Sequence, residues 1–584
     1  MKRLIFLLFP LFAMSLSAQP AIQYTMDFRE PNSHLIDITM TIRNALPGTQ
    51  QVALPAWRPG RYAIQNYSRL VQEVRAASET GLPLPIRKLN KDTWEISNGN
   101  VSAITVTYSF YATILDAGST FYNDQEIYFN GSNLFMYVPG RLNEPVFLKI
   151  NHPDGWQTAT ALKPAGPKSF TAASFHELAD SPTIISPTLQ HRKVTVDSIN
   201  FHIWIQGETN GNPDALAEGI RKMARTHLDF WQGVVPFTDF HFLYHLVDYR
   251  SGHGVEHAKS TSMVLGPLTN LPDPDDWKRA YPTTSHELFH AWHVKYLVPA
   301  DLEPYDYSKE QYTNLIWFLE GFTSYFDIYL NHKAGLITEA EYWEEFERLI
   351  RQSELNPGTA VTSIADASYD AWLYGYSSDG NKNRMVTFYS QGELFALLLD
   401  LDIRKETNHQ KTLGDLMRWL VAEFPVKGRF YQESDLLNGL KLLTGKSYAP
   451  WFADYVHGTK PFPFQQAFDS AGYELIKVPA DPVSRTLLGA DFKRVDEDWV
   501  VDQVLPDSPA MKAGLFLGDK LSGSVFHPLP DKNLDAWLAG NLSDSTLTLE
   551  VKRRGKPVKL VLSGLNTTHY TYKIQKKTNH TSPW

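Results

Sequence analysis

The chain has no cysteine among its 584 residues, and this absence limits its chemistry. Disulfides, thiol catalysis, thiolate metal ligands and a lipidated cysteine anchor all require cysteine, so each of them is excluded. Long apolar runs are equally scarce. Beyond residue 18, no segment approaches the roughly 20 consecutive apolar residues that a membrane-spanning helix needs. We therefore expect a protein without a membrane anchor.

Basic sequence is sparse as well. The formal net charge is -9, and Lys552-Arg553-Arg554 is the only sizeable basic run outside the carboxyl-terminal tail. Nucleic acids bind mainly to clustered lysine and arginine, so a nucleic acid is not an expected partner. The composition, 43% hydrophobic and 20% charged, is typical of globular protein, and the length is too great for one core. We expect three or four domains.

The first 18 residues have the composition of a secretory signal peptide. Lys2 and Arg3 precede an apolar run over residues 4–16, and the small residues Ser17 and Ala18 follow it. This order predicts export, with cleavage near Ala18. An exported chain without disulfides suits a bacterial envelope, so we expect the protein in the periplasm or outside the cell.

One string in the middle of the chain specifies a reaction by itself, and it is His286-Glu287-Leu288-Phe289-His290. Helical residues four apart lie on one face, about 6 Å apart along the axis, so both imidazoles can bind one metal ion. Glu287 then lies beside the metal, where its carboxylate can take a proton from a water that zinc has made acidic. The string predicts a zinc hydrolase with one zinc ion per chain.

A third ligand is needed, because H-E-x-x-H arises by chance in about one such chain in thirty and zinc prefers a tetrahedral site. Glu320 lies in an aromatic-rich helical run over residues 317–326, and we predict it to be this ligand. The alternative is a glutamate on a solvated helix surface. Asp327 follows two helical turns later on the same face, where it can accept a hydrogen bond from a zinc-binding histidine. An exposed aspartate is the alternative.

His293 is a rival for the third ligand, because it shares a helical stripe with the two histidines of the motif. On a continuous helix, however, about 10 Å of rise separates it from His286, whereas two ligands of one zinc lie about 3 to 4 Å apart. We expect His293 to be a neighbour of the site, and its role stays open.

The sequence before residue 190 indicates an all-β domain. Apolar and polar residues alternate over residues 36–42 and 104–110, as in half-buried strands, and Asn130-Gly131 predicts a hairpin turn between two apolar runs. From residue 191 the pattern changes to strands around a helix over residues 214–231, and then to mainly helical sequence. We predict a multidomain α+β chain with an N-terminal β domain over residues 19–190 and a mainly α catalytic domain over residues 191–478.

Residues 479–565 form a separate module in the sequence. The strand-like run over residues 500–504 and the string over residues 507–515, which contains Ser508-Pro509-Ala510, closely resemble PDZ domains of secreted bacterial proteases. Such a domain can capture the carboxyl terminus of a protein by strand addition, and a structural cap with an unused groove is the alternative. The polar sequence over residues 566–584 predicts a flexible tail.

Over nearly its whole length the chain resembles the glycyl aminopeptidase family of zinc metallopeptidases. The resemblance rests on residues 286–292 and 317–325, on the 29 residues between His290 and Glu320, and on two further strings, residues 254–257 (Gly-Val-Glu-His) and 389–392 (Tyr-Ser-Gln-Gly). It implies a thermolysin-like catalytic domain and a PDZ domain. His293 departs from the family, in which asparagine is expected. Residues 55–62 are similar to the family's amino-terminal signature, and we expect them to support the wall of the active site.

Three further residues receive roles. Gly254 follows a strand-like run over residues 240–247, and a glycine there permits close approach of an extended substrate to a sheet edge. A glutamate in a similar string binds the substrate's free amine in aminopeptidases, so the resemblance assigns this role to Glu256. Tyr389 begins an apolar helix, and the resemblance assigns its phenol to the oxyanion of the tetrahedral intermediate. A loop glutamate and a core tyrosine are the alternatives.

Together these features predict an exported zinc aminopeptidase that acts on peptides, and the resemblance implies a preference for amino-terminal Gly or Ala. Two alternatives stay open. One is a zinc endopeptidase whose PDZ domain delivers unfolded carboxyl termini. The other is an inactive peptide-binding scaffold, against which the intact metal motif argues.

Overall fold

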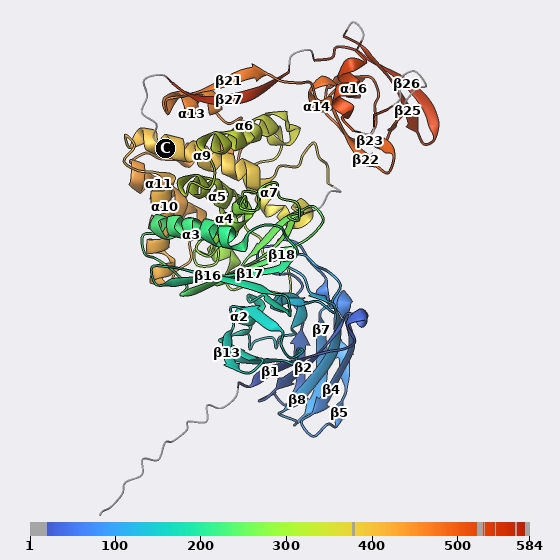
Figure 1. Cartoon of the computed structure of the whole chain (residues 1–584), viewed down its shortest axis with the longest axis vertical. Helices are drawn as coiled ribbons and strands as arrows, with labels where there is room; N and C mark the ends of the chain where they lie inside the picture. The colour runs from blue at the N-terminus through green and yellow to red at the C-terminus, as the bar shows by residue number, and fades with distance from the viewer. Residues whose placement is uncertain are drawn as a thin grey trace, which may run out of the picture. The chain divides into compact units, whose positions relative to one another are not determined.

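The computed structural model describes residues 20–376, 380–522, 529–530, 532–542, 545–566 and 569–577, and the predicted signal peptide lies outside them. The chain divides into two compact units, whose elements Figure 1 labels. The first comprises the chain up to Ala56, Asn66–Leu115 and Ser119–Thr188, and the second comprises Trp57–Gln65, Asp116–Gly118 and the chain from Leu189 onward. Among the described residues, no helix is long and apolar enough to cross a membrane.

The first unit consists mainly of β-sheet, as the sequence predicted. In β2 (Leu35–Ile42) every second residue is buried, because successive side chains of a strand point to opposite faces. An eight-stranded sheet has the order β13 (Lys163–Gly166), β14 (Ser169–Ala172), β11 (Val146–Ile150), β1 (Ile22–Phe28), β2, β8 (Ile104–Tyr111), β4 (Val71–Ser78) and β5 (Pro83–Leu84). Two smaller sheets have the orders β12 (Gln157–Thr160), β15 (Thr183–Ser186), β10 (Ile127–Phe129), β9 (Phe121–Tyr122) and β3 (Gly48–Ala53), β7 (Thr93–Gly99), β6 (Ile86–Lys88).

The predicted hairpin at Asn130-Gly131 is wrong. Residues Gly131–Leu134 form a short helix, α1, and β10 pairs with β9 and β15 instead. Gly131 has a different reason to be glycine: a Cβ there would lie 2.2 Å from the carbonyl oxygen of Leu178, in α2 (Phe175–Ala179). The glycine permits a close contact between two segments and does not serve a tight turn.

The second unit begins with a five-stranded sheet. Its order is β16 (Gln190–Val196), β17 (Ile199–Gly207), β18 (Asp239–Leu246), β20 (Ser260–Gly266) and β19 (Ser251–Glu256). The helix α3 (Pro213–Phe230) connects the parallel strands β17 and β18, in good agreement with the predicted helix. The predicted strand over residues 240–247 is inside the sheet, whereas β19, which carries Gly254 and Glu256, is the edge strand and runs antiparallel to β20.

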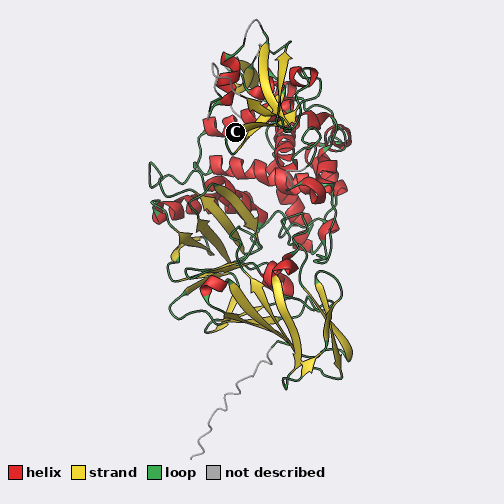
Figure 2. Cartoon of the chain, turned by 90° about the vertical axis from the view of Figure 1, so that its right-hand side faces the viewer, coloured by secondary structure: helices red, strands yellow, loops and turns green. Residues whose placement is uncertain are grey.

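Helices form most of the rest of this unit, as Figure 2 shows, and this confirms the predicted helical region. Residues Leu394–Leu399 of α9 are fully buried, because this stretch of the helix is apolar on every side and other helices surround it. The helices are α4 (Tyr281–His290), α5 (Phe322–Lys333), α6 (Glu339–Leu355), α7 (Ile364–Tyr369), α8 (Ala371–Tyr374), α9 (Phe388–Glu406), α10 (Leu413–Glu423), α11 (Glu433–Thr444), α12 (Ala449–Trp451) and α13 (Phe464–Ser470).

The module that the sequence assigned to a PDZ domain has its own apolar core. Its sheet has the order β22 (Ala490–Val495), β23 (Asp498–Val504), β24 (Lys520–Ser522), β25 (Leu547–Arg553) and β26 (Lys556–Leu562). Among the described residues of the module, the short helices α14 (Ser484–Leu487), α15 (Pro509–Lys512) and α16 (Leu534–Gly540) accompany this sheet.

The prediction of a flexible tail is wrong for residues 570–576. They form β27 (Tyr570–Lys576), which pairs antiparallel with β21 (Tyr473–Pro479), the strand that precedes the module. Tyr572 and Ile574 alternate with polar residues and are buried, and the backbone N–H of Ile574 donates to Glu347 of α6 at 2.8 Å. The module is therefore an insertion between two paired strands.

Candidate active site

His286, His290 and Glu320 come together in the structure. Both histidines lie on α4, and Glu320 lies in a π-helical segment, η4 (Trp317–Gly321), that leads directly into α5. His286 Nε2 is 3.1 Å from His290 Nε2, and Glu320 Oε2 is 3.5 Å and 3.3 Å from these two nitrogens. Single turns of π-helix often mark functional sites. These three side chains form the one group of potential ligands found among the described residues that could hold a metal ion.

The triangle fits a tetrahedral metal such as zinc. Zinc lies about 2.0 to 2.2 Å from nitrogen and oxygen ligands, so two ligand atoms at a tetrahedral angle are about 3.3 to 3.5 Å apart. The observed separations of 3.1 to 3.5 Å agree with this value. Burial would raise the pKa of Glu320, but His290 and His286 lower it to about 2, so the carboxylate is anionic.

The outer nitrogen of each histidine is held by an acceptor, which leaves both Nε2 atoms facing the triangle. His286 Nδ1 is 2.9 Å from the Asp327 carboxylate, at the position that the sequence predicted for Asp327. His290 Nδ1 is 2.7 Å from the backbone carbonyl oxygen of His293. Such partners fix the tautomer of a metal-binding imidazole.

His293 therefore touches the site through its backbone. The helix α4 ends at His290, so residues 286 and 293 do not share a continuous helix. The His293 ring is buried against Phe318, with ring centroids 4.5 Å apart, and burial holds its pKa well below the ordinary value. Sequence reasoning missed the carbonyl, because a backbone acceptor leaves no signal in residue identity.

Glu287 lies beside the triangle and directly against the edge strand. A Cβ on Gly254 would lie 2.3 Å from Glu287 Oε1, so glycine is required where β19 passes the carboxylate. Glu287 is 5% exposed, and its Oε2 has no hydrogen-bond partner in the described part of the chain. Burial raises the pKa of Glu287 to about 7, against the opposing effect of His286 and His290. A carboxylate with a pKa near neutrality suits a general base.

Tyr389 lies near the triangle at the start of α9. Its ring centroid is 6.3 Å from that of His286. Burial, the negative charge of Glu320 and the nearby phenol of Tyr376 raise the pKa of Tyr389 well above its ordinary value, so it stays a hydrogen-bond donor. Sequence reasoning missed Tyr376, because it lies in no recognisable motif.

Glu256, at the end of β19, is a buried carboxylate without a partner among the described residues. It is 6% exposed, and no described residue donates a hydrogen bond to its side chain or forms an ion pair with it. A buried carboxylate without a cation is costly, so this group is suited to a charged ligand.

A turn from the amino-terminal half of the chain lies against Glu256. The Arg61 N–H donates to the Arg58 carbonyl at 3.3 Å, and Gly60 has a φ of 82°, as a type II turn with Pro-Gly at its centre requires. A Cβ on Gly60 would lie 2.3 Å from both oxygens of Glu256. Within residues 55–62, residues 57–62 belong to the second unit and Gly60 contacts Glu256, whereas Pro55 and Ala56 belong to the first unit.

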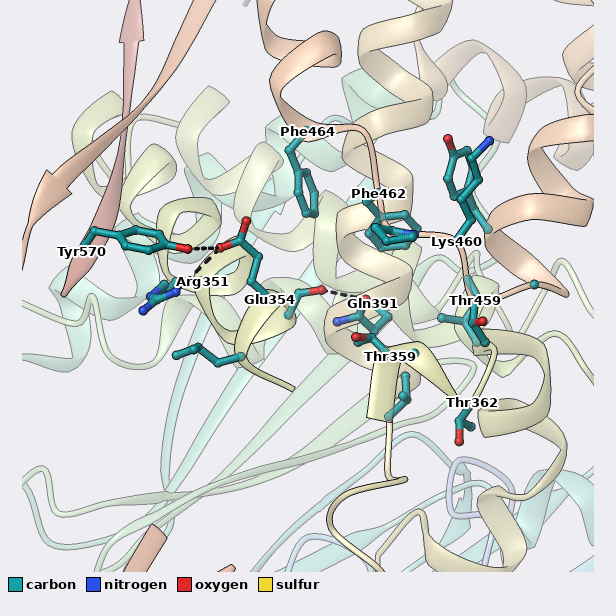
Figure 3. Close-up of a pocket in the computed structure, with 18 residues that line it drawn as sticks. Arg351, Glu354, Thr359, Thr362, Gln391, Thr459, Lys460, Phe462, Phe464 and Tyr570 are labelled. Carbon is teal, nitrogen blue, oxygen red and sulfur yellow. Dashed lines mark hydrogen bonds and ion pairs between the residues drawn. The ribbon is translucent and has the colours of Figure 1, made fainter. Parts of the chain in front are cut away.

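A separate cavity of about 600 Å³ lies in the helical region, and Figure 3 shows its lining. Its polar contacts include Tyr570 to Glu354 at 3.1 Å and Ser353 to Gln391 at 3.1 Å. None of the residues predicted to bind metal or to catalyse hydrolysis lines this cavity. The candidate active site is therefore the triangle and its neighbours.

Family models and solved structures show which proteins this chain resembles. The family model of the peptidase M61 N-terminal domain matches residues 23–187, and that of the M61 glycyl aminopeptidase matches residues 279–395. An aminopeptidase N family protein from Idiomarina loihiensis is 26% identical, with a TM-score of 0.87 over 95% of this chain and 98% of that one. An M1 zinc metallopeptidase from Deinococcus radiodurans is 14% identical, with a TM-score of 0.48 over 76% of this chain and 95% of that one. No curated protein matches.

The match of residues 279–395 to the M61 glycyl aminopeptidase model supports a peptidase, and the His-His-Glu triangle is its candidate metal site. The two family matches confirm the resemblance seen in the motifs of the chain.

Proposed function

We propose that this protein is an exported, zinc-dependent aminopeptidase that removes amino-terminal residues, preferentially Gly or Ala, from peptides. His286, His290 and Glu320 would hold one zinc ion per chain, and their separations support a tetrahedral ion. A bound zinc ion polarises the scissile carbonyl and acidifies a water molecule. The preference for Gly or Ala and the export rest on the family resemblance and on residues 1–18.

The protein side chains supply the remaining chemistry. Glu287 takes the proton of the attacking water and later delivers it to the leaving amine. Tyr389 donates a hydrogen bond to the oxyanion of the tetrahedral intermediate. The backbone of β19 around Gly254 pairs with the extended substrate, since an edge strand leaves its N–H and C=O groups available.

The observation that carries the aminopeptidase assignment is the unpaired Glu256 carboxylate. It lies at the end of the edge strand and is buried, so an ammonium group would supply the missing cation. An endopeptidase has no use for such a group, because internal peptide bonds bring no charge to this point.

Comparing H-Ala-anilide with N-acetyl-Ala-anilide tests the proposal. We expect the wild type to cleave the free amine and hardly the acetylated substrate. Glu256→Gln should reduce kcat/KM for the free amine by about 30-fold or more, because a buried charge pair is lost, with zinc content unchanged. Glu208→Gln, an exposed glutamate beyond β17, is the matched control. Equal cleavage of both substrates by the wild type would favour the endopeptidase.

The inserted module is proposed to be a PDZ domain that can bind protein carboxyl termini, and its edge strand β22 offers the surface for strand addition. A structural cap is the other role that the module can have. Titration with peptides that end in a free or an amidated carboxyl group distinguishes the two, since only a PDZ groove prefers the free carboxylate.

A further inference from the structure

A second unpaired charge lies next to Glu256, and it is positive. The Arg61 guanidinium lies over the ring of Tyr376, 5.1 Å from the ring centroid, and its Nε is buried without a hydrogen-bond partner. Among the described residues, none forms an ion pair with Arg61. Its neighbour in sequence, Gly60, touches Glu256, yet these two opposite charges do not pair with each other.

The other arginine of the turn is enclosed. Arg58 is 3% exposed, and a Cβ on Gly118 would lie 2.3 Å from its Nε. Arg58 therefore anchors the turn, whereas the Arg61 guanidinium has no ion-pair partner in the described part of the chain.

Arg61 follows Gly60 directly, and Gly60 contacts Glu256. The Arg61 guanidinium covers the ring of Tyr376, whose hydroxyl is 3.5 Å from the Gly60 carbonyl oxygen. Neighbouring α-carbons are about 3.8 Å apart and an arginine side chain reaches about 7 Å, so the two charges are separated by at most about 15 Å.

We propose that Arg61 binds the carboxylate of short peptide substrates, so that Glu256 and Arg61 together select di- and tripeptides with both ends free. This inference rests on the proposed aminopeptidase function. A peptide that joins β19 in the antiparallel sense, with its amine at Glu256, runs back toward Ser251. An extended tripeptide spans about 10 Å, which is within the reach of the Arg61 side chain from Glu256.

The chemistry suits this role. A guanidinium presents N–H groups in a fork that matches both oxygens of a carboxylate, and such charge-assisted pairs are stronger than neutral hydrogen bonds. Its position over Tyr376 restricts the Arg61 side chain, so less conformational entropy is lost when the ligand binds.

The test compares tri-alanine with tri-alanine amide. Wild type should cleave the free acid about 10- to 100-fold more efficiently in kcat/KM, mainly through KM, because the amide cannot form the ion pair. Arg61→Gln should bring this ratio close to one by lowering kcat/KM for the free acid. Arg61→Lys should retain part of the ratio. Arg69→Gln, an exposed arginine eight residues away, should keep the wild-type ratio. Penta-alanine and penta-alanine amide should be cleaved with similar kcat/KM, because the carboxylate of the longer peptide extends beyond Arg61.

A wild-type ratio near one, or a full ratio in Arg61→Gln, would overturn the proposal. The wild-type ratio decides even if Arg61→Gln fails to fold. If the enzyme cleaves H-Ala-anilide but does not prefer tri-alanine to its amide, only the carboxylate role of Arg61 is refuted, and the aminopeptidase assignment stands. Failure to discriminate H-Ala-anilide from its acetylated form would refute the aminopeptidase assignment instead.

Discussion

Gly392 of α9 is packed directly on η4, the segment that carries Glu320. A Cβ on Gly392 would lie 2.3 Å from the carbonyl oxygen of Trp317 and 3.0 Å from Cα of Gly321. A Cβ on Gly321 would lie 2.4 Å from Cα of Gly392. This glycine pair sets the distance between the two helical segments, and therefore between the proposed ligand Glu320 and Tyr389.

Gly392→Ala should separate these segments. The added methyl group has only backbone atoms to displace, so we expect a loss of about 1 to 3 kcal/mol in the free energy of unfolding. The kcat of the folded variant should also fall, by more than any loss of folded protein explains, because both Glu320 and Tyr389 shift. Thermal unfolding and kcat on H-Ala-anilide measure the two effects. Gly540→Ala in α16, with open space around it, is the control, and equal behaviour of the two variants would refute the close-packing argument.

Gly254→Ala should inactivate the enzyme without unfolding it. The new Cβ would lie 2.3 Å from Glu287 Oε1 and would push the general base away from the scissile bond. A displacement of about 1 Å at such a group costs about 100-fold in rate. Gly252→Ala is the matched control, because it lies on the same face of the same strand with nothing within 4 Å. Similar kcat values for both variants would contradict the proposed role of Glu287.

How far the sequence predicts this site depends on the residue. The pair His286 and His290 and the position of Asp327 relative to Glu320 follow from helical spacing, which is local information, whereas Glu320 itself was predicted from the aromatic-rich run that contains it. The His293 carbonyl, Tyr376 and Arg61 were missed, because backbone acceptors and contacts between distant segments have no spacing signal. In the fold, alternation predicted β2, yet the same pattern in Tyr572 and Ile574 was overlooked because polar neighbours suggested a tail.

Asp327→Ala should weaken metal binding. Its carboxylate holds His286 Nδ1 at 2.9 Å, and loss of such a partner lowers metal affinity about 10- to 100-fold. Asp327→Asn keeps an acceptor oxygen, so its metal affinity should fall less than that of Asp327→Ala. Competition with a chromophoric zinc chelator measures both affinities. Equal affinities of wild type and Asp327→Ala would show that the hydrogen bond does not orient the ligand.

Glu287→Gln and Glu320→Gln should differ although both are isosteric. Glu287→Gln keeps the three proposed ligands, so zinc content should stay near one per chain while kcat falls by orders of magnitude. Glu320→Gln replaces an anionic ligand by a neutral amide and should lose zinc as well as activity. Metal analysis of the dialysed proteins and kcat on H-Ala-anilide separate the roles. Substantial activity in Glu287→Gln would end the proposed mechanism.

The inserted module should be removable, but only at the strands that flank it. Pro479 pairs with Tyr570, and the Ala480 N–H donates to the His569 carbonyl at 3.1 Å. Replacing residues 481–568 by Asn-Gly would close β21 and β27 into a two-residue hairpin. We expect this shortened chain to fold, bind zinc and cleave H-Ala-anilide within about threefold of the full chain, because the proposed catalytic residues all precede residue 390.

Truncation after residue 478 is the informative contrast, because it also removes β27. Glu347 of α6, 6% exposed, would lose the Ile574 N–H and the Lys573 ammonium, each at 2.8 Å, and β21 would lose its strand partner. An unsatisfied buried group costs about 1 to 3 kcal/mol, so the truncated chain should unfold at a lower temperature than the hairpin version. A hairpin version that folds and binds zinc but cannot cleave H-Ala-anilide would show that the module completes the active site.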